Sequence, residues 1–110
     1  MQRDKTYLLD ILEAAKLAID YVGNRSIDEF LGDTQCQDAV IRRLEIIGEA
    51  AKRISDETKC THPEVPWFEM VGMRNVVIHE YDDIDMVVIW DTIKKDIPSL
   101  VAAIRPIVSE

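Results

Sequence analysis

Apolar residues recur every three or four positions along most of this 110-residue chain, and that spacing constrains its fold more than any other feature. It is the period of one face of an α-helix. The clearest stripe lies near the start and consists of Leu8, Ile11, Leu12, Ala15, Ala18, Ile19 and Val22. We therefore predict an amphipathic helix from about 3 to 22, ended by Gly23 and Asn24. No stretch of the sequence alternates polar and apolar residues as a β-strand does.

A short helical turn is predicted after this helix. Ser26 and Glu29 have the spacing of a capping box, in which each residue's side chain accepts a hydrogen bond from the other's backbone. The turn that they start should tuck both Phe30 and Leu31 inward.

A second long stripe predicts a helix from about 34 to 55, capped by Asp33 or Thr34. Its members are Val40, Ile41, Leu44, Ile47, Gly48, Ala51 and Ile54. The polar stretch SDETKCTHPEVP follows and is predicted to be a loop.

Two more helices complete the pattern. Pro66 is predicted at the first position of a helix over about 66–80, because its missing N–H costs nothing there. Asp83 is expected to cap a last helix over about 84–108, and Pro98 to kink it. The apolar stripe of that helix is Ile84, Val87, Val88, Ile93, Ile97, Leu100, Val101, Ile104 and Val108.

Four long helices and one short turn, joined by brief connections, predict an all-α fold: an antiparallel four-helix bundle with an additional short helical turn. A chain of this length is expected to form a single domain over 1–110. Apolar residues make up 47% of the sequence, so we also expect one face to be buried in a homodimer.

The acidic charge limits the partners that this chain can bind. With 21 Asp and Glu against 13 Lys and Arg, its formal net charge is -8 at pH 7. Proteins that coat nucleic acid non-specifically are usually basic, because neutralising phosphates releases counterions. We therefore expect any RNA to bind at a local cationic cleft or with the help of a partner.

The chain is expected to work in the cytoplasm, without a membrane anchor, a metal or another cofactor. Its two cysteines, Cys36 and Cys60, have the spacing of neither a disulfide framework nor a zinc site. No window approaches the roughly 20 apolar residues that span a bilayer. The first residues lack the uninterrupted apolar core of a signal peptide.

The segment RNVVIHEY carries the strongest candidates for chemistry, which are Arg74, Asn75, His79 and Tyr81. Asn75 and His79 share a helix face, whereas Arg74 and His79 lie about 140° apart around the axis. Arg74 and His79 would meet if the helix ends near His79, if the arginine reaches round it, or if a two-fold partner supplies one of them.

The residue types at this segment suit proton transfer beside a phosphate. At the last turn of a helix, the dipole favours a protonated His79, and Arg74 offers a fork of donors for phosphate. Polar residues at the wet end of a core helix would give the same pattern, with the Tyr81 hydroxyl in water. Spacing alone therefore leaves both interpretations open.

Three other groups are weaker candidates. Cys60 and His62 offer two ligands, which do not make a metal site. The carboxylates within 80–85 could hold a divalent cation, but such a run is more typical of a capped, solvated helix start. Arg42 and Arg43 are expected to form a solvated face with neighbouring glutamates, although they could extend a cationic cleft.

The segment PEVPWFEMVGMRNVVIHEYDDID resembles the hallmark of HepT-like proteins, a branch of the HEPN superfamily. Arg74, His79 and Tyr81 fill its R-x-x-x-x-H-x-Y core. The stretches RDKTYLLDILEA, SIDEFLGD and AVIRRLEIIGEAAKRIS also resemble the family, in the same order. The resemblance therefore covers nearly the whole chain.

This resemblance implies an α-helical, dimeric, metal-independent ribonuclease toxin of a type VII-like toxin–antitoxin system. Its antitoxin, MntA, is a small nucleotidyltransferase that would attach AMP to Tyr81. We expect His79 to transfer protons, Arg74 to hold the phosphate and Asn75 to orient its neighbours in a cleft shared by two subunits. A non-catalytic helical adaptor, which would bind a nucleotidyltransferase or a nucleotide through the same cleft, is the alternative.

Overall fold

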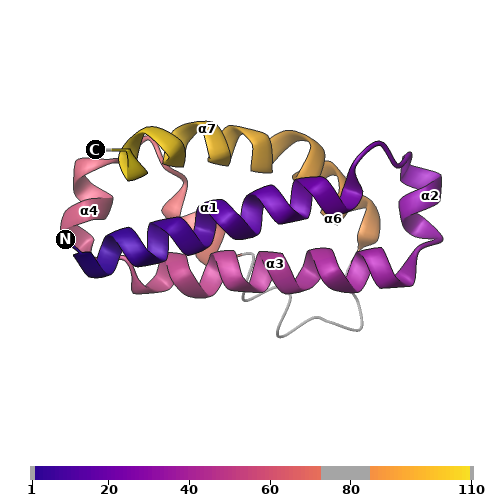
Figure 1. Cartoon of the computed structure of the whole chain (residues 1–110), viewed down its shortest axis with the longest axis horizontal. Coiled ribbons are helices and arrows are strands. Elements are labelled where there is room, and N and C mark those ends of the chain that lie inside the picture. The colour runs from indigo at the N-terminus through magenta and orange to yellow at the C-terminus, as the bar shows by residue number, and fades with distance from the viewer. Residues whose placement is uncertain (1, 73–84, 110) are drawn as a thin grey trace.

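The computed structural model describes residues 2–72 and 85–109, and these residues are almost entirely helical (Figure 1). The elements are α1 (Gln2–Val22), α2 (Ile27–Leu31), α3 (Thr34–Arg53), α4 (Asp56–Thr61), α6 (Met86–Asp91), the π-helical segment η2 (Thr92–Asp96) and α7 (Ile97–Val108). Residues 67–72 are helical as well. Within these two ranges there is no strand, which confirms the predicted all-α class.

Three long helices lie lengthwise beside one another. α1 packs against both α3 and α7, and these two helices run in the direction opposite to α1 (Figure 1). The short helices α2 and α4 lie at opposite ends of this arrangement. The third predicted helix, over about 66–80, lies mostly outside the described residues, so the four-helix count stays a prediction.

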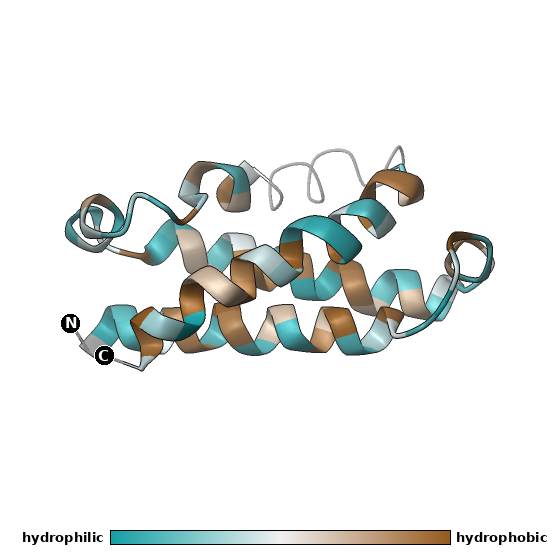
Figure 2. Ribbon diagram, turned by 90° about the horizontal axis from the view of Figure 1, so that it is seen from above, coloured by the Kyte–Doolittle hydropathy of each residue, from teal (hydrophilic) through white to brown (hydrophobic). Residues whose placement is uncertain are grey.

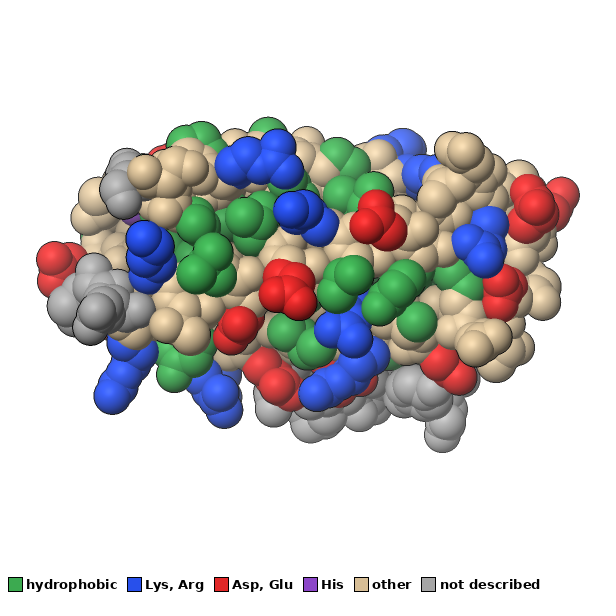
Figure 3. All heavy atoms as spheres, in the orientation of Figure 1, with side chains coloured by type: hydrophobic (Ala, Val, Ile, Leu, Met, Phe, Trp, Pro, Cys, Tyr) green, Lys and Arg blue, Asp and Glu red, His purple; other side chains and the backbone are tan. Residues whose placement is uncertain are grey.

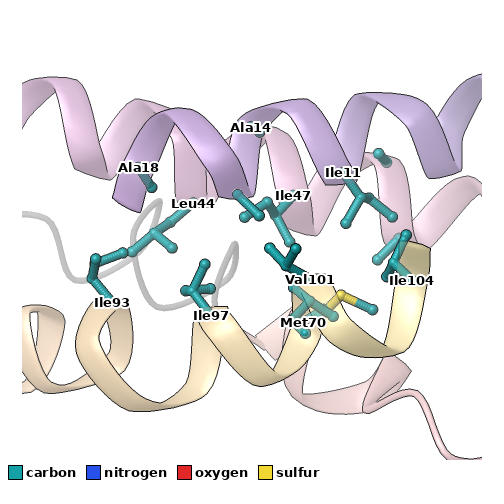
Figure 4. Packing of buried hydrophobic residues seen from close by; sticks show 14 of the residues in the cluster. Ile11, Ala14, Ala18, Leu44, Ile47, Met70, Ile93, Ile97, Val101 and Ile104 are labelled. Atoms are coloured by element: carbon teal, nitrogen blue, oxygen red, sulfur yellow. The ribbon is translucent and has the colours of Figure 1, made fainter. Parts of the chain in front are cut away.

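The core lies between these helices and confirms the two stripes of the first half of the chain. Hydrophobic and hydrophilic residues form separate bands along the long helices (Figure 2). Apolar side chains from α1, from α3, from the helical residues 67–72 and from η2 and α7 point into one shared space. Figure 4 shows this for Ile11, Ala14, Ala18, Leu44, Ile47, Met70, Ile93, Ile97, Val101 and Ile104. Removing this apolar surface from water supplies most of the stabilisation of such a fold.

The capping predictions in the first half are confirmed by hydrogen bonds. Ser26 and Glu29 form the capping box of α2, with the Glu29 N–H donating to Ser26 Oγ at 3.2 Å and the Ser26 N–H to Glu29 Oε1 at 3.0 Å. Asp33 caps α3 by accepting the Cys36 N–H at 3.0 Å.

The prediction that both apolar residues of α2 turn inward was wrong for one of them. Phe30 is fully buried, but Leu31 is 44% exposed. Successive residues of a helix point about 100° apart. A turn of five residues that packs on one side can therefore bury only one of the two.

The polar stretch after α3 was predicted to be a loop, and this was wrong for its first half. α4 occupies Asp56–Thr61, and Ser55 caps it by accepting the Thr58 N–H at 3.2 Å. Pro66 was predicted at the first position of its helix, but it immediately precedes the helix, which begins at residue 67. The Met70 N–H donates to the Pro66 carbonyl.

The last helical region differs from its prediction at its start. α6 begins at Met86, and Asp85 rather than Asp83 caps it, with Asp85 Oδ1 accepting the Val87 N–H at 2.9 Å. Val87 and Val88 are 40% and 56% exposed, whereas Ile89 is buried. Ile89 lies one turn before the buried Ile93, so the two valines that precede it turn away from the core.

A kink was predicted at Pro98 and stays a prediction, but the structure shows a π-helical segment directly before this proline. Helical structure continues from α6 through η2 into α7, and Pro98 stands in the first turn of α7. A proline lacks the N–H of an ordinary helical bond, and its ring collides with the carbonyl four residues earlier. The wider π turn over Thr92–Asp96 accommodates both effects directly before the proline.

Candidate functional site

The four residues of the predicted site, Arg74, Asn75, His79 and Tyr81, lie outside the described residues. Their predicted roles therefore stay predictions. The structure does describe the chain on both sides of them, residues 67–72 before the motif and α6 after it. These two flanks show how the motif is attached to the core.

The flank that leads into the motif is anchored by two buried side chains. Trp67 is 8% exposed, and its indole N–H donates to the carbonyl oxygen of His62 at 2.9 Å. Met70 is fully buried in the core cluster. The chain thus remains attached to the core until four residues before Arg74.

The flank that follows the motif is anchored by α6. Asp85 caps the helix, Ile89 is buried, and α6 packs against α2. Trp90 is half-buried against the core, and the Lys94 ammonium lies 5.7 Å from the centre of its ring. The carboxylate of Asp85 therefore serves the helix start, as the solvated-cap interpretation predicts.

Exposed apolar side chains concentrate on these two flanks. Among the described residues, Phe68 is 87% exposed, and it stands on the leading flank. Val87 and Val88 are exposed on the following flank. Leu9 and Leu31 are the other large apolar residues exposed in the described ranges.

The weaker metal candidates gain no support from the described residues. His62 Nδ1 lies 3.4 Å from Glu64 Oε2, and Cys60 is exposed. Nowhere in 2–72 and 85–109 do three His, Cys, Asp or Glu residues come together as metal ligands. Burial raises the pKa of the Cys36 thiol, which holds it in the protonated form.

The two arginines of α3 do different things. Arg42 is exposed, with its Nη1 3.7 Å from Glu45 Oε2, as predicted for a solvated face. The Arg43 guanidinium lies 6.0 Å from the centre of the Tyr21 ring, and its Nε is buried without a hydrogen-bond partner among the described residues. The sequence offered no signal for this contact, because Tyr21 and Arg43 belong to different helices.

On one face of the molecule, the described cations are interspersed with other side chains rather than gathered. On the face shown in Figure 3, Lys and Arg side chains alternate with Asp and Glu and with apolar residues. The structure also contains, within its described ranges, no helix long and apolar enough to cross a membrane.

The chain has an all-α core, and helical segments of that core stand on both sides of an R-x-x-x-x-H-x-Y motif. This combination defines a class of small helical proteins built around the motif. Residues 11–107 match the protein family described as Ribonuclease HepT-like, and this stretch includes the whole motif. The chain therefore belongs to the HepT-like ribonuclease family.

Curated relatives agree with this assignment. A protein of Thermococcus cleftensis named as a probable ribonuclease HepT is 50% identical over 96 residues, which cover 87% of each chain. A relative from Methanocaldococcus jannaschii is 43% identical over 87% of this chain and 88% of its own. One from Caldanaerobacter subterraneus is 38% identical over 100% of this chain and 98% of its own. The names of the last two give RNase as a candidate activity. No solved structure matches the chain.

Proposed function

We propose that this protein is a metal-independent endoribonuclease, the toxin of a type VII-like HepT/MntA toxin–antitoxin system. The observation that carries the proposal is the family match over residues 11–107, which contains Arg74, Asn75, His79 and Tyr81. The relatives' names support an RNA substrate. In this proposal the helical flanks hold the motif at one place on the bundle, and the segment that begins at residue 67 supplies its fourth helix.

The proposed reaction uses the 2′-hydroxyl of the RNA as its nucleophile. That oxygen attacks the adjacent phosphorus while the bond from phosphorus to the 5′-oxygen breaks, which leaves a 2′,3′-cyclic phosphate and a free 5′-hydroxyl. One His79 takes the proton of the attacking hydroxyl, and a second His79 gives a proton to the leaving oxygen. Arg74 stabilises the negative charge on the phosphate, and Asn75 orients these groups.

A homodimer supplies the second histidine in this scheme. The support for a dimer is the apolar surface exposed on the two flanks, at Phe68, Val87 and Val88. These residues border the motif segment in the sequence, so a partner that covered them would also approach the motif. A contact of this kind between two identical subunits is the common form of protein dimer.

Regulation is proposed to act on Tyr81. A small nucleotidyltransferase of the MntA kind would attach AMP to its hydroxyl, which places a negative phosphate beside Arg74 and repels RNA. The competing function is a non-catalytic helical adaptor that binds a nucleotidyltransferase or a nucleotide. The net charge of -8 favours that alternative, because it opposes RNA binding.

The catalytic proposal is tested by RNA cleavage in a chelating buffer. Wild-type protein should cleave, and Arg74→Ala and His79→Ala should each lower the rate by at least about 100-fold. Arg42→Ala is the matched control, since it removes an exposed arginine of α3 whose ion pair within the described residues is with Glu45. Circular dichroism checks that each variant is folded.

Two results would contradict this proposal. Folded wild-type protein that cleaves none of a varied set of RNAs would favour the adaptor. Cleavage that survives both substitutions would move the catalytic site elsewhere.

The modification is tested by intact mass after incubation with ATP and a small nucleotidyltransferase of the MntA kind. The mass should rise by whole AMP units, and Tyr81→Phe should abolish the increase. An equal increase in the Tyr81→Phe variant would place the modification on another residue.

The dimer is tested by sedimentation of Phe68→Ser. Loss of an 87% exposed aromatic side chain should weaken the dimer without unfolding the chain. Leu9→Ser is the control, because Leu9 is a 45% exposed apolar residue of α1, which is not part of either flank. If both variants dissociate alike, or neither does, the flanks do not form the interface.

A further inference from the structure

A groove of about 450 Å³ lies between the segment 64–69 and the start of α7. It is formed by two regions that are some thirty residues apart in the sequence. Its lining combines charged walls with an apolar floor, and no role proposed above uses it.

The walls of the groove are acidic. Glu64, Glu69 and Asp96 line it, and all three residues are exposed. Among the described residues that line the groove there is no Lys or Arg. On one side of the groove, His62 Nδ1 lies 3.4 Å from Glu64 Oε2. The other two carboxylates have no ion pair within the described residues.

The floor of the groove is apolar. It consists of Pro66, the buried Leu100 and the half-buried Ala103. A groove with an apolar floor and charged walls is a kind of surface that binds an amphipathic helix of a partner protein.

We propose that this groove docks a basic amphipathic segment of a partner protein. Apolar side chains of that segment would lie on Leu100 and Ala103, and its Lys or Arg side chains would meet Glu69 and Asp96. Charge complementarity selects this occupant, because acidic walls attract cations and speed their encounter. The inference goes beyond the proposed ribonuclease function and stands whether or not the chain cleaves RNA.

Other occupants fit the groove less well. RNA phosphates would meet three carboxylates and be repelled. A second copy of this chain has a net charge of -8 and would bring more negative than positive charge to the contact. A metal ion would need ligands that converge, and the described residues hold no such group.

The test is the binding of a fluorescent amphipathic peptide, with Lys and Arg one helical turn apart beside Leu, measured by anisotropy. A peptide with Glu in place of each Lys and Arg is the negative control. Wild-type protein should bind the basic peptide saturably, and added salt should weaken the binding. The double variant Glu69→Lys/Asp96→Lys should bind at least about tenfold more weakly.

A matched variant separates the groove from the overall charge. Asp10→Lys/Glu13→Lys changes the net charge by the same amount at two exposed positions of α1, and it should bind within about twofold of wild type. Glu69→Gln/Asp96→Asn removes the groove charges with little change of shape, in case the lysine variant fails to fold. Amide NMR signals of Ser99 and Ala103 should shift when the peptide binds.

Several results would overturn the proposal. These are the absence of saturable binding at millimolar peptide, equal losses in the groove variant and the α1 variant, and NMR shifts that avoid the groove. Single-stranded RNA that competes for the same residues would make the groove a nucleic-acid site. Self-association that the groove variant abolishes would make it an interface between copies.

Discussion

Hydrogen bonds of charged side chains stabilise both ends of α1, and the charges at the two ends have opposite sign. At the first turn, the Asp4 carboxylate accepts the Ser55 N–H at 3.1 Å, the Ser55 hydroxyl at 2.5 Å and the Thr58 hydroxyl at 2.6 Å. Beyond the last turn, Arg25 donates to the Tyr21 carbonyl at 2.5 Å and Lys94 to the Gly23 carbonyl at 2.8 Å. Each charge complements the helix dipole at its own end.

The charged side chains at the two ends differ in burial. Asp4 is 4% exposed, and its partners lie 51 and 54 residues away, where α3 ends and α4 begins. The Arg25 side chain is 41% exposed. Water can replace a hydrogen bond that is lost at an exposed site, whereas buried donors left without an acceptor pay the full cost of desolvation. The hydrogen bonds of Asp4 should therefore contribute much more to stability than those of Arg25.

The largest expected effect comes from Asp4→Ala. It leaves the Ser55 N–H and two hydroxyl groups without their acceptor and should lower the free energy of unfolding by about 2–4 kcal/mol. Urea denaturation followed by circular dichroism measures the change. Asp10→Ala, at an exposed position of the same helix, should change it by less than about 0.5 kcal/mol. Similar losses in both variants would contradict the special role of Asp4.

Protonation of Asp4 at low pH should remove the same stabilisation. Burial opposes ionisation of Asp4, but the hydrogen bonds from Ser55 and Thr58 outweigh it and hold the pKa of the carboxyl below its ordinary value of 3.8. A carboxyl with a lowered pKa in the folded state stabilises above the unfolded pKa and loses that contribution as the pH falls through the folded pKa.

The stability difference between wild type and Asp4→Asn should therefore be constant near neutral pH and shrink as the pH falls below about 4. Denaturation curves over a pH series measure it. A difference that grew on acidification would mean that the carboxyl is bound in its protonated form.

A smaller effect is expected at the opposite end. Arg25→Ala removes the bond to Tyr21 and the 3.2 Å ion pair with Asp33, and should cost about 0.5–1 kcal/mol. Part of this loss should disappear in high salt, because the pair is partly exposed. If Arg25→Ala costs as much as Asp4→Ala, burial does not explain the difference between the two ends.

The smallest effect is expected from Lys94→Met. The substitution keeps the side-chain stem but removes the ammonium that bonds to the Gly23 carbonyl and lies over the Trp90 ring. The expected loss is about 0.5 kcal/mol, from thermal unfolding compared with Lys95→Met at the adjacent exposed position. A loss above about 2 kcal/mol would show that this exposed contact supports the core.

Sequence patterns predicted the local features of the fold better than its long-range ones. The stripes of α1 and α3, the Ser26 capping box and the Asp33 cap depend on residues within a turn or two of one another, and all are confirmed. The position of α4 was missed because its residues, DETKCT, show no apolar period. The hydrogen bonds from Ser55 and Thr58 to Asp4 were missed because the carboxylate and its donors lie more than fifty residues apart in the sequence.

The family, and with it the candidate site, was recognised from the R-x-x-x-x-H-x-Y motif and its surroundings, and the match over 11–107 confirms the family. The roles of Arg74, Asn75, His79 and Tyr81 stay predictions, because these residues lie outside the described ranges. The acidic groove was not predicted, since nothing in the sequence brings Glu69 beside Asp96. Such features arise from packing rather than from local pattern.

The π-helical segment makes one part of the last helical region tolerant of a change in chain length. A π turn holds more residues than an α turn, so Thr92–Asp96 contains a surplus that a regular helix would not need. Loss of one residue there would let the segment relax to ordinary α geometry. The same deletion within α3 would rotate half of its buried stripe by about 100° and carry it out of the core.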